Sequence, residues 1–282
     1  MNKLIKITLI GKTNAGKSTL INNMVGEKIS IINKKINTTQ ESLIGIRNYK
    51  NIQIIIYDTP GINFLRTSKP LNKNLKVNLW SSIDEADILI YMIDIIRFNY
   101  KNIIQDIKKL SEVKKPILLL FNKIDLVDKN EILPKIDLLK DFQNITSFLS
   151  ISAKKNIGIN KLIKFISLKS YNAKWIYQNN EITNKDDIYI TNECTRNAIL
   201  KFLHKEIPYN IKIKNTLFKY LKNNDLKIKQ TIELDNKRYK PIILGKKGNT
   251  IKRIRECSQK DIKSIINNNI HLYLQIDTKN AK

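Results

Sequence analysis

Gly11-Lys12-Thr13-Asn14-Ala15-Gly16-Lys17-Ser18, near the start of this 282-residue chain, matches the pattern GxxxxGK[ST]. An apolar stretch at 4–10 precedes it, and a stretch typical of a helix follows at 18–25. In this strand–loop–helix setting, backbone N–H groups and the positive end of the helix surround the phosphates of a nucleoside triphosphate. We expect Lys17 to reach the β- and γ-phosphates and the Ser18 hydroxyl to bind Mg²⁺. The pattern does not distinguish ATP from GTP.

A second motif, Asp58-Thr59-Pro60-Gly61, follows the strand-like run at 53–57. A carboxylate at a strand end is well placed to hold Mg²⁺ through a water molecule, so Asp58 is the second metal candidate. The N–H of Gly61 can contact the γ-phosphate because glycine has no side chain to block the approach.

A third motif, Asn122-Lys123-Ile124-Asp125, indicates which base is bound. An aspartate carboxylate accepts two hydrogen bonds from the N1–H and the exocyclic amine of guanine. Adenine offers no such pair of donors, so a buried Asp125 would stay unpaired beside ATP. Ser152-Ala153-Lys154 follows the next strand-like run and supplies backbone donors for the guanine O6. The sequence therefore predicts a guanine nucleotide.

The pattern of apolar runs predicts the fold of the first domain. Short, nearly continuous apolar runs are typical of strands buried on both faces of a parallel sheet. Such runs alternate with stretches at helical spacing, which indicates a doubly wound α/β domain with a mostly parallel sheet. We expect strands at 4–10, 88–93, 117–121 and 148–151, a hairpin of 43–47 with 53–57, and helices at 18–25, 71–82, 103–112, 132–142 and 160–168.

A smaller α+β domain is predicted at the C-terminal end. Ile243-Leu244-Gly245-Lys246-Lys247-Gly248 with Ile251 fits the (I/L)GxxGxxI signature of an RNA-binding KH domain of type II. Eight basic and no acidic residues occupy 237–255. We expect helices at 192–205 and 250–267 and strands at 209–214, 226–234 and 270–276. The predicted domains are a GTPase domain at 1–172, a connector at 173–190 and a KH domain at 191–282.

Composition narrows the class of protein. Hydrophobic residues make up 42% of the chain, enough for a packed core, and two cysteines make no disulfide framework. No apolar stretch approaches the length of a transmembrane helix, and the N-terminus is not typical of a signal peptide. The formal net charge is +26. This excess indicates a polyanionic partner such as nucleic acid, or an A+T-rich genome whose codons favour lysine, and both explanations stay open.

With these motifs in this order and spacing, and with Thr38-Thr39 between the first two, the chain resembles Era, a family of bacterial ribosome-assembly GTPases. The resemblance covers nearly the whole chain. It implies that Thr39, with Thr38 as the alternative, completes the Mg²⁺ shell in the GTP state, and that segments 29–42 and 59–80 are switches. Ile62 stands where many small GTPases carry a water-orienting glutamine, so we expect slow intrinsic hydrolysis. Asn14 is implied near a K⁺ ion, with simple loop hydrogen bonding as the alternative.

The resemblance also implies partners and a location. We expect GTP and GDP as nucleotides, Mg²⁺ as cofactor, and the 3′ region of 16S ribosomal RNA within the 30S subunit as the RNA partner. We expect a monomer in the cytoplasm, with peripheral attachment to the inner face of the cell membrane as a further alternative.

The candidate residues fall into four sets. The catalytic candidates are Lys17, Thr39 and Gly61, and the metal candidates are Ser18, Thr39 and Asp58. The nucleotide-binding candidates are Gly11, Lys12, Thr13, Asn14, Ala15, Gly16, Lys17, Ser18, Thr19, Asp58, Thr59, Pro60, Gly61, Ile62, Asn122, Lys123, Ile124, Asp125, Ser152, Ala153 and Lys154. The RNA-binding candidates are Ile243, Leu244, Gly245, Lys246, Lys247, Gly248, Ile251, Lys252, Arg253 and Arg255.

Other functions remain as alternatives. The chain could be an RNA-binding module that holds a guanine nucleotide structurally and never cycles, and multiple-turnover GTP hydrolysis separates this from an enzyme. A different GTPase, such as a tRNA-modifying or double-domain relative, fits less well because only one GKS is present and a KH-like domain follows. An ATPase is disfavoured by Asp125.

Overall fold

The structure is a computed structural model of the 282-residue chain, and it describes residues 1–26, 43–59, 61–62, 73–142, 144–203 and 211–278. Contacts between residues divide the chain into two compact units, Met1–Asn184 and Lys185–Lys282. Thr38, Thr39, Pro60, the whole predicted switch at 29–42 and half of the one at 59–80 lie outside the described residues.

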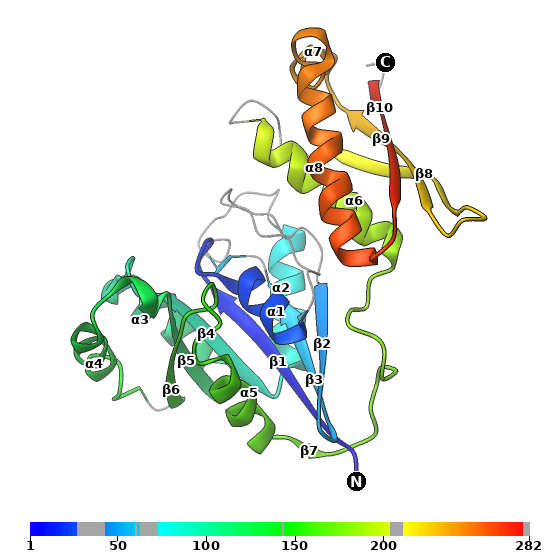
Figure 1. Ribbon diagram of the computed structural model, residues 1–282. Helices are drawn as coiled ribbons and strands as arrows, with labels where there is room; N and C mark the ends of the chain where they lie inside the picture. Colours follow the sequence, from blue (N-terminus) through cyan, green and yellow to red (C-terminus); the bar gives the residue numbers. More distant parts are fainter. Residues whose placement is uncertain (27–42, 60, 63–72, 143, 204–210, 279–282) are drawn as a thin grey trace. The chain divides into compact units, whose positions relative to one another are not determined.

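The first unit is built on a mostly parallel sheet (Figure 1) with the strand order β2-β3-β1-β4-β5-β6. Strand β2 runs antiparallel to β3, and the short β7 adds to β1 in the antiparallel direction. The central strands are buried along almost their whole length, as their continuous apolar runs predict. The strands are β1 (Lys3–Gly11), β2 (Leu43–Tyr49), β3 (Ile52–Asp58), β4 (Ile88–Asp94), β5 (Ile117–Asn122), β6 (Ile145–Ile151) and β7 (Tyr171–Asn172).

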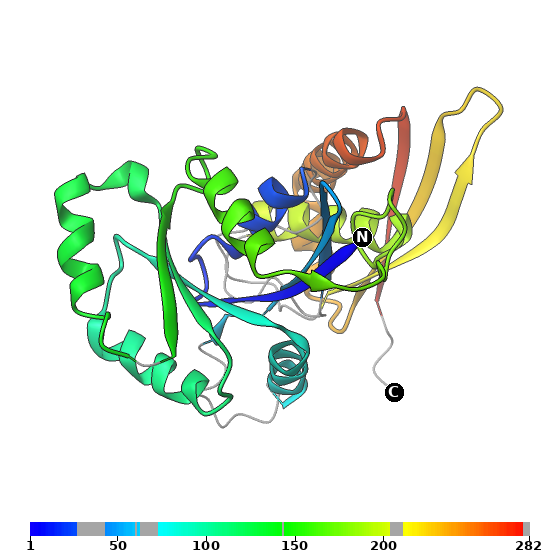
Figure 2. The ribbon, with the colours of Figure 1, turned by 90° about the horizontal axis from the view of Figure 1, so that it is seen from below.

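Helices cover both faces of this sheet, which confirms the doubly wound α/β fold (Figure 2). Helices α2, α3 and α4 pack on one face, where Leu79, Ile83 and Ile107 join one apolar cluster. Helices α1 and α5 lie on the other face and contact each other. The helices are α1 (Lys17–Val25), α2 (Lys73–Glu85), α3 (Tyr100–Ser111), α4 (Ile132–Asp137) and α5 (Ile159–Leu168), with short 3-10 turns η3 (Ile124–Leu126) and η4 (Lys129–Glu131).

The stretch expected as a polar connector packs against the first unit as far as Asn184. The N–H of Ile46 donates to the carbonyl of Ile182 at 2.8 Å, and Gly45 forms an antiparallel bridge with Thr183. The N–H of Ile44 donates to Oδ1 of Asn184 at 3.0 Å. This segment therefore adds to the outer edge of β2, where it satisfies backbone groups that an edge strand would expose.

The second unit has a three-stranded sheet in the order β10-β9-β8. Strands β9 and β10 are parallel, and β8 is antiparallel to β9. Helices α6 and α8 pack together, and two apolar clusters join them to one face of the sheet. The elements are α6 (Asp187–Phe202), β8 (Lys212–Tyr220), β9 (Leu226–Leu234), α7 (Tyr239–Leu244), η5 (Lys246–Gly248), α8 (Asn249–Ile266) and β10 (Ile270–Thr278).

Three predicted boundaries are wrong by five residues or more. The helix expected at 192–205 begins at Asp187, because the side chain of Asp186 caps it by accepting a hydrogen bond from the Tyr189 N–H at 2.7 Å. The strand expected at 209–214 begins at Lys212 and continues to Tyr220. The helix expected at 132–142 ends at Asp137, and turns follow it. Among the described helices, none combines the length and apolarity needed to cross a membrane.

Candidate functional site

The phosphate-loop lysine lies inside its own loop. Lys17 begins α1 directly after the loop, and its side chain is buried. Its Nζ donates to the carbonyl of Gly11 at 2.9 Å and to that of Lys12 at 3.1 Å. Burial away from water lowers the pKa of Lys17 to about 8, and the nearby Asp58 carboxylate opposes this shift. The loop thus holds an ammonium group that a polyphosphate would stabilise.

The predicted Mg²⁺ candidate Asp58 sits where β3 ends, beside the strand that leads into the phosphate loop. The register pairs Asp58 with Leu9 of β1, and the Asp58 side chain is buried. The Thr59 hydroxyl fixes the chain after the strand by donating to the Leu9 carbonyl at 2.5 Å. Ser18 follows Lys17 at the start of α1, so a hydroxyl and a carboxylate supply the hard oxygen donors that Mg²⁺ prefers.

Gly61 lies directly against the phosphate loop. A Cβ atom placed on Gly61 would be 2.5 Å from Cγ2 of Thr13 and 2.8 Å from its backbone nitrogen. Only glycine permits this approach. The structure therefore brings the second motif into contact with the first, as the sequence predicts.

The side chain of Ile62 points away from the nucleotide candidates. It is completely buried and belongs to the cluster that contains Ile10, Leu79 and Ile83. Only the backbone of Ile62 can face a nucleotide, and its side chain cannot orient water. Ile124 packs against the same cluster but is only partly buried.

Asn122 connects three loops. Its Nδ2 donates to the carbonyl of Ala15 in the phosphate loop at 2.8 Å, and its Oδ1 accepts from the Ala153 N–H at 2.9 Å. The Asn23 side chain donates to the Ala153 carbonyl and adds α1 to the network. Ser152 is buried, and its Oγ accepts from the Lys155 N–H at 3.1 Å, whereas Lys154 is exposed.

One contributor was not identified from the sequence. Lys123 forms an ion pair with Asp94 at 2.5 Å, and the Asp94 side chain is nearly buried. Asp94 ends β4, and the register pairs it with Asn122. The same signal that singled out Asp58, a carboxylate at the end of an apolar run, marks Asp94 as well.

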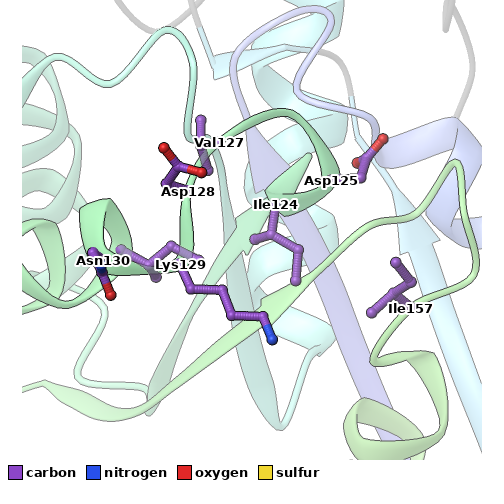
Figure 3. A pocket seen from close by; sticks show the side chains of 8 residues that line it. Ile124, Asp125, Val127, Asp128, Lys129, Asn130 and Ile157 are labelled. Atoms are coloured by element: carbon purple, nitrogen blue, oxygen red, sulfur yellow. The ribbon is translucent and has the colours of Figure 1, made fainter.

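Asp125 carries an oxygen that lacks a partner within the described part of the chain. Its Oδ1 is buried and accepts no hydrogen bond. A buried carboxylate oxygen without a donor is costly, so this atom is suited to a ligand that brings one. A hollow of about 670 Å³ adjoins it, and Figure 3 shows the Asp125 carboxylate directed away from the Lys129 side chain. The hollow is lined by Ile124, Asp125, Val127, Asp128, Lys129, Asn130, Ile132 and Ile157.

The GxxG loop of the second unit has the backbone that the signature predicts. Gly245 has a φ of 69°, and a Cβ there would lie 2.0 Å from Oγ1 of Thr250. Lys247 also has a positive φ of 51°. Lys246, Lys247 and Lys252 are exposed. The loop therefore displays cationic side chains around a tight turn.

Some apolar residues beside this loop belong to the core, among them the RNA-binding candidate Ile243. Ile243 and Ile254 are completely buried in the cluster beneath α6, so their side chains cannot contact a base in this conformation. Leu244 is exposed and Ile251 is partly exposed, which leaves these two for contact. The guanidinium carbon of Arg253 lies 4.8 Å from the centroid of the Phe202 ring, and Arg255 is partly buried beside Gln259.

Family comparisons match both units. The family model described as a 50S ribosome-binding GTPase matches residues 6–123, and the model described as a KH domain matches residues 203–282.

Similar proteins and structures match almost the entire chain. GTPase Era of Rickettsia bellii (strain OSU 85-389) is 33% identical over 99% of this chain and 94% of its own. GTPase Era of Ehrlichia ruminantium (strain Gardel) is 31% identical over 96% of this chain and 91% of its own. A crystal structure of Era with MgGDPNP and nucleotides 1506–1542 of 16S ribosomal RNA is 31% identical, with a TM-score of 0.88 over 99% of this chain and 94% of that one.

Proposed function

This chain belongs to the GTPase Era family, and from that membership we propose that its KH unit binds the 3′ region of 16S ribosomal RNA and that it acts in assembly of the 30S subunit. The family makes the chain a GTPase, which favours a cycling enzyme over a module with a fixed nucleotide. The observation that carries the RNA partner is the likeness, over 99% of the chain, to an Era structure that holds both MgGDPNP and 16S ribosomal RNA.

In the proposed nucleotide site, the buried ammonium of Lys17 binds the β- and γ-phosphates in place of the Gly11 and Lys12 carbonyls. Ser18 binds Mg²⁺ directly, and Asp58 does so through water. When bound, Mg²⁺ neutralises charge that develops on the phosphate oxygens. The N–H of Gly61 contacts the γ-phosphate from its place against Thr13. We assign Thr39 to the same metal shell.

We also propose that intrinsic hydrolysis is slow in the absence of a partner. The buried Ile62 offers no group to position the attacking water. We propose an intrinsic rate on the order of 10⁻⁴–10⁻² s⁻¹, as in unassisted GTPases. A single-turnover assay with purified protein measures this rate, and turnover many times a second would contradict the assignment.

Asn14 is proposed to lie beside a K⁺ ion when GTP is bound. Its φ of 65° places it at the bend of the phosphate loop. The hydrolysis rate should then be higher in KCl than in NaCl at equal ionic strength, and Asn14→Ala should remove the difference. An Asn14→Ala variant that keeps the full K⁺ response would exclude this role.

On the RNA side, we propose that the GxxG loop approaches the RNA backbone, with Lys246, Lys247 and Lys252 on phosphates and Leu244 and Ile251 beneath bases. The first unit senses the γ-phosphate and changes the grip of the second on RNA. We also propose that the protein acts as a monomer in the cytoplasm, where the ribosomal RNA is located.

The test is RNA footprinting with the 3′ region of 16S ribosomal RNA in two nucleotide states. The protein is loaded with a non-hydrolysable GTP analogue or with GDP, and multiple-turnover GTP hydrolysis is measured with and without 30S subunits. We expect protection that is stronger in the GTP-analogue state. Identical footprints in both states would refute the coupling, and no footprint in either would refute the RNA partner.

A further inference from the structure

The sheet of the second unit has one face without a helix among the described residues. Helices α6 and α8 cover the other face, as Figure 2 shows. Side chains alternate along β9: Leu226 and Ile228 are fully buried, whereas Lys227 is only partly buried and Lys229 is exposed. Because successive strand residues point to opposite faces, the lysines lie on the face away from the helices.

Strand register gathers basic residues at one end of this face. Lys227 of β9 pairs with Lys219 of β8 on one side and with His271 of β10 on the other. Two residues further along these strands, on the same face, Lys229 of β9 pairs with Tyr273 of β10. Three lysines on adjacent strands repel one another, which costs stability unless an anion is present. This arrangement suggests a function other than folding.

Acidic residues on the same face lie at its opposite end or are paired with a basic side chain. Glu233 and Asp277 pair with each other in the register, two rows beyond Lys229, and Glu233 forms an ion pair with Lys214 at 2.5 Å. At the basic end, the carboxylate of Asp225 lies 2.9 Å from Nε2 of His271. The lysines at 219, 227 and 229 therefore dominate the charge of that end.

An exposed aromatic ring sits among these lysines. The Tyr273 side chain is 53% exposed although it lies in the middle of a strand. The Nζ of Lys227 lies 5.7 Å from the centroid of its ring. An aromatic ring on an open sheet with cations around it is a surface on which a base can stack while its phosphates are neutralised.

We propose that this outer basic face, made of Lys219, Lys227, Lys229, His271 and Tyr273, binds a second single-stranded segment of the RNA whose first segment occupies the GxxG loop. The inference rests on the proposed RNA partner. It adds a separate site, because the GxxG loop joins α7 to α8, and α8 covers the opposite face of the sheet. Tyr273 stacks on a base, and the three lysines contact phosphates. Tyr273 is exposed among these lysines, and Leu217, which pairs with Lys229 in the register, is only partly exposed. The described part of this face therefore favours RNA over a membrane surface, into which several apolar side chains must insert.

The experiment compares two single-stranded RNAs from the 3′ region of 16S ribosomal RNA. One has about six nucleotides, enough for a KH groove that grips about four, and the other has about twenty. The test variant of the full chain is K219E/K227E/K229E. The control variant is K101E/K108E/K109E, which replaces three exposed lysines of α3 and changes the net charge by the same amount. The neutral version K219Q/K227Q/K229Q is used if the glutamates disturb folding.

We expect the variant of the outer basic face to weaken binding of the long RNA at least tenfold and leave the short RNA unchanged. The salt dependence for the long RNA should fall by a slope of about 2, since each of three phosphate contacts contributes about 0.7. Tyr273→Ala should weaken binding of the long RNA about fivefold or more, and the Tyr273→Phe variant should bind it like the unaltered chain. The α3 control should bind both RNAs normally.

Several outcomes overturn the inference. Equal effects on long and short RNA, or none on either, exclude a separate segment on this face. If K219E/K227E/K229E instead loses sedimentation with phosphatidylserine-containing vesicles and binds long RNA normally, the face is a membrane surface. If the unaltered chain binds the short RNA no more weakly than the long one, only the GxxG loop is used. If it binds neither RNA, the proposed function fails, and the inference fails with it.

Discussion

The side chain of Asn122 donates a hydrogen bond to the carbonyl of Ala15 at 2.8 Å, although the two residues are 107 positions apart. The other end of the same amide accepts from the Ala153 N–H. One planar group therefore sets the distance between the phosphate loop and the loop that faces the base. Both ends of the amide are buried, so neither partner can turn to water instead.

Asn122→Ala should loosen the nucleotide site and destabilise the first unit. It leaves the Ala15 carbonyl and the Ala153 N–H without partners, at about 1–3 kcal/mol each. We expect GDP to dissociate at least tenfold faster and the free energy of unfolding to fall by about 2–4 kcal/mol. Stopped-flow release of a fluorescent GDP and denaturant unfolding measure the two effects. Asn160→Ala, at an exposed position of α5, is the control and should change neither.

Asp125→Asn should change which base is bound. The carboxylate would lose its charge and one of its two acceptor positions, while xanthine offers the complementary pattern. We expect GTP affinity to fall about 100-fold, consistent with the loss of charge-assisted hydrogen bonds, and xanthosine triphosphate affinity to rise. Competition binding against labelled GDP measures both. Asp128→Asn, three residues away and exposed beside the same hollow, should leave base preference unchanged. Equal GTP affinity in the two variants would remove Asp125 from the base site.

Nucleotide binding should become weaker as the pH rises above about 8. The pKa of Lys17 is about 8 in the free protein because burial disfavours its charged form. Bound phosphates favour the charged form and raise this pKa, so the complex holds a proton that the free protein has lost. At pH 8.5, about three-quarters of a proton should be taken up on binding, given a free pKa of about 8. Calorimetry in two buffers with different ionisation enthalpies measures this uptake.

Lys17→Arg is the control for this linkage, because arginine stays charged throughout the range. Guanine loses its own proton at alkaline pH, and this effect is common to both proteins. The difference between the two profiles therefore isolates Lys17. If both chains take up the same number of protons at pH 8.5, Lys17 is already charged in the free protein, and the expected pH dependence is wrong.

Gly245→Ala and Gly248→Ala should differ sharply in their effects on stability and on RNA binding, although both glycines belong to the GxxG motif. Gly248 lies in the left-handed region, where an alanine costs about 1–2 kcal/mol in backbone strain. Gly245 has a φ of 69° and a ψ of 176°, a conformation essentially restricted to glycine. A Cβ at 245 also collides with Thr250, whereas a Cβ at 248 meets no atom within 4 Å. We expect Gly245→Ala to lower the melting temperature of the second unit further and to weaken RNA binding more. Equal melting temperatures in thermal scans would contradict this geometry.

Most of the first unit could be predicted because local signals and tertiary structure agree there. The runs around 88–93 and 117–121 are strands with nearly the predicted ends, and Gly61 meets the phosphate loop as its motif requires. Parallel strands place their carboxyl ends at one edge of the sheet, so motifs that follow strands converge there. The GTPase and KH folds were both recognisable from such motifs.

The features that were not predicted from the sequence depend on contacts between residues that are distant in the chain. Asp94 ends an apolar run as Asp58 does, but only its ion pair with Lys123 gives it a place in the site. Ile243 reads as an apolar residue beside the GxxG loop, and only the packing of α6 shows that it is buried. The stretch at 173–184 is polar and looks like a free connector, yet its backbone is held by hydrogen bonds to the backbone of β2 and to the Gln53 side chain of β3. Such bonds leave no pattern in the residues that make them.

Gln53→Met should release this segment from the first unit. Gln53 is completely buried, and its Oε1 accepts from the N–H groups of Ile176 and Tyr177 at 3.0 Å each. Its Nε2 donates to the Tyr177 carbonyl at 3.0 Å and to Oδ1 of Asn48 at 3.2 Å. Methionine fills similar space but leaves the two backbone N–H groups without an acceptor, so the segment gains by opening to water.

We expect the amide protons of Ile176 and Tyr177 to exchange at least tenfold faster in Gln53→Met, because each lost hydrogen bond contributes about 1 kcal/mol. Exchange at the buried strand β5 should change much less, since the loss is local. Gln105→Met, at an exposed position of α3, is the matched control and should leave both regions unchanged. Unaltered exchange at 176–177 would mean that the contacts along β2, rather than Gln53, hold the segment. Hydrogen–deuterium exchange mass spectrometry resolves these regions separately.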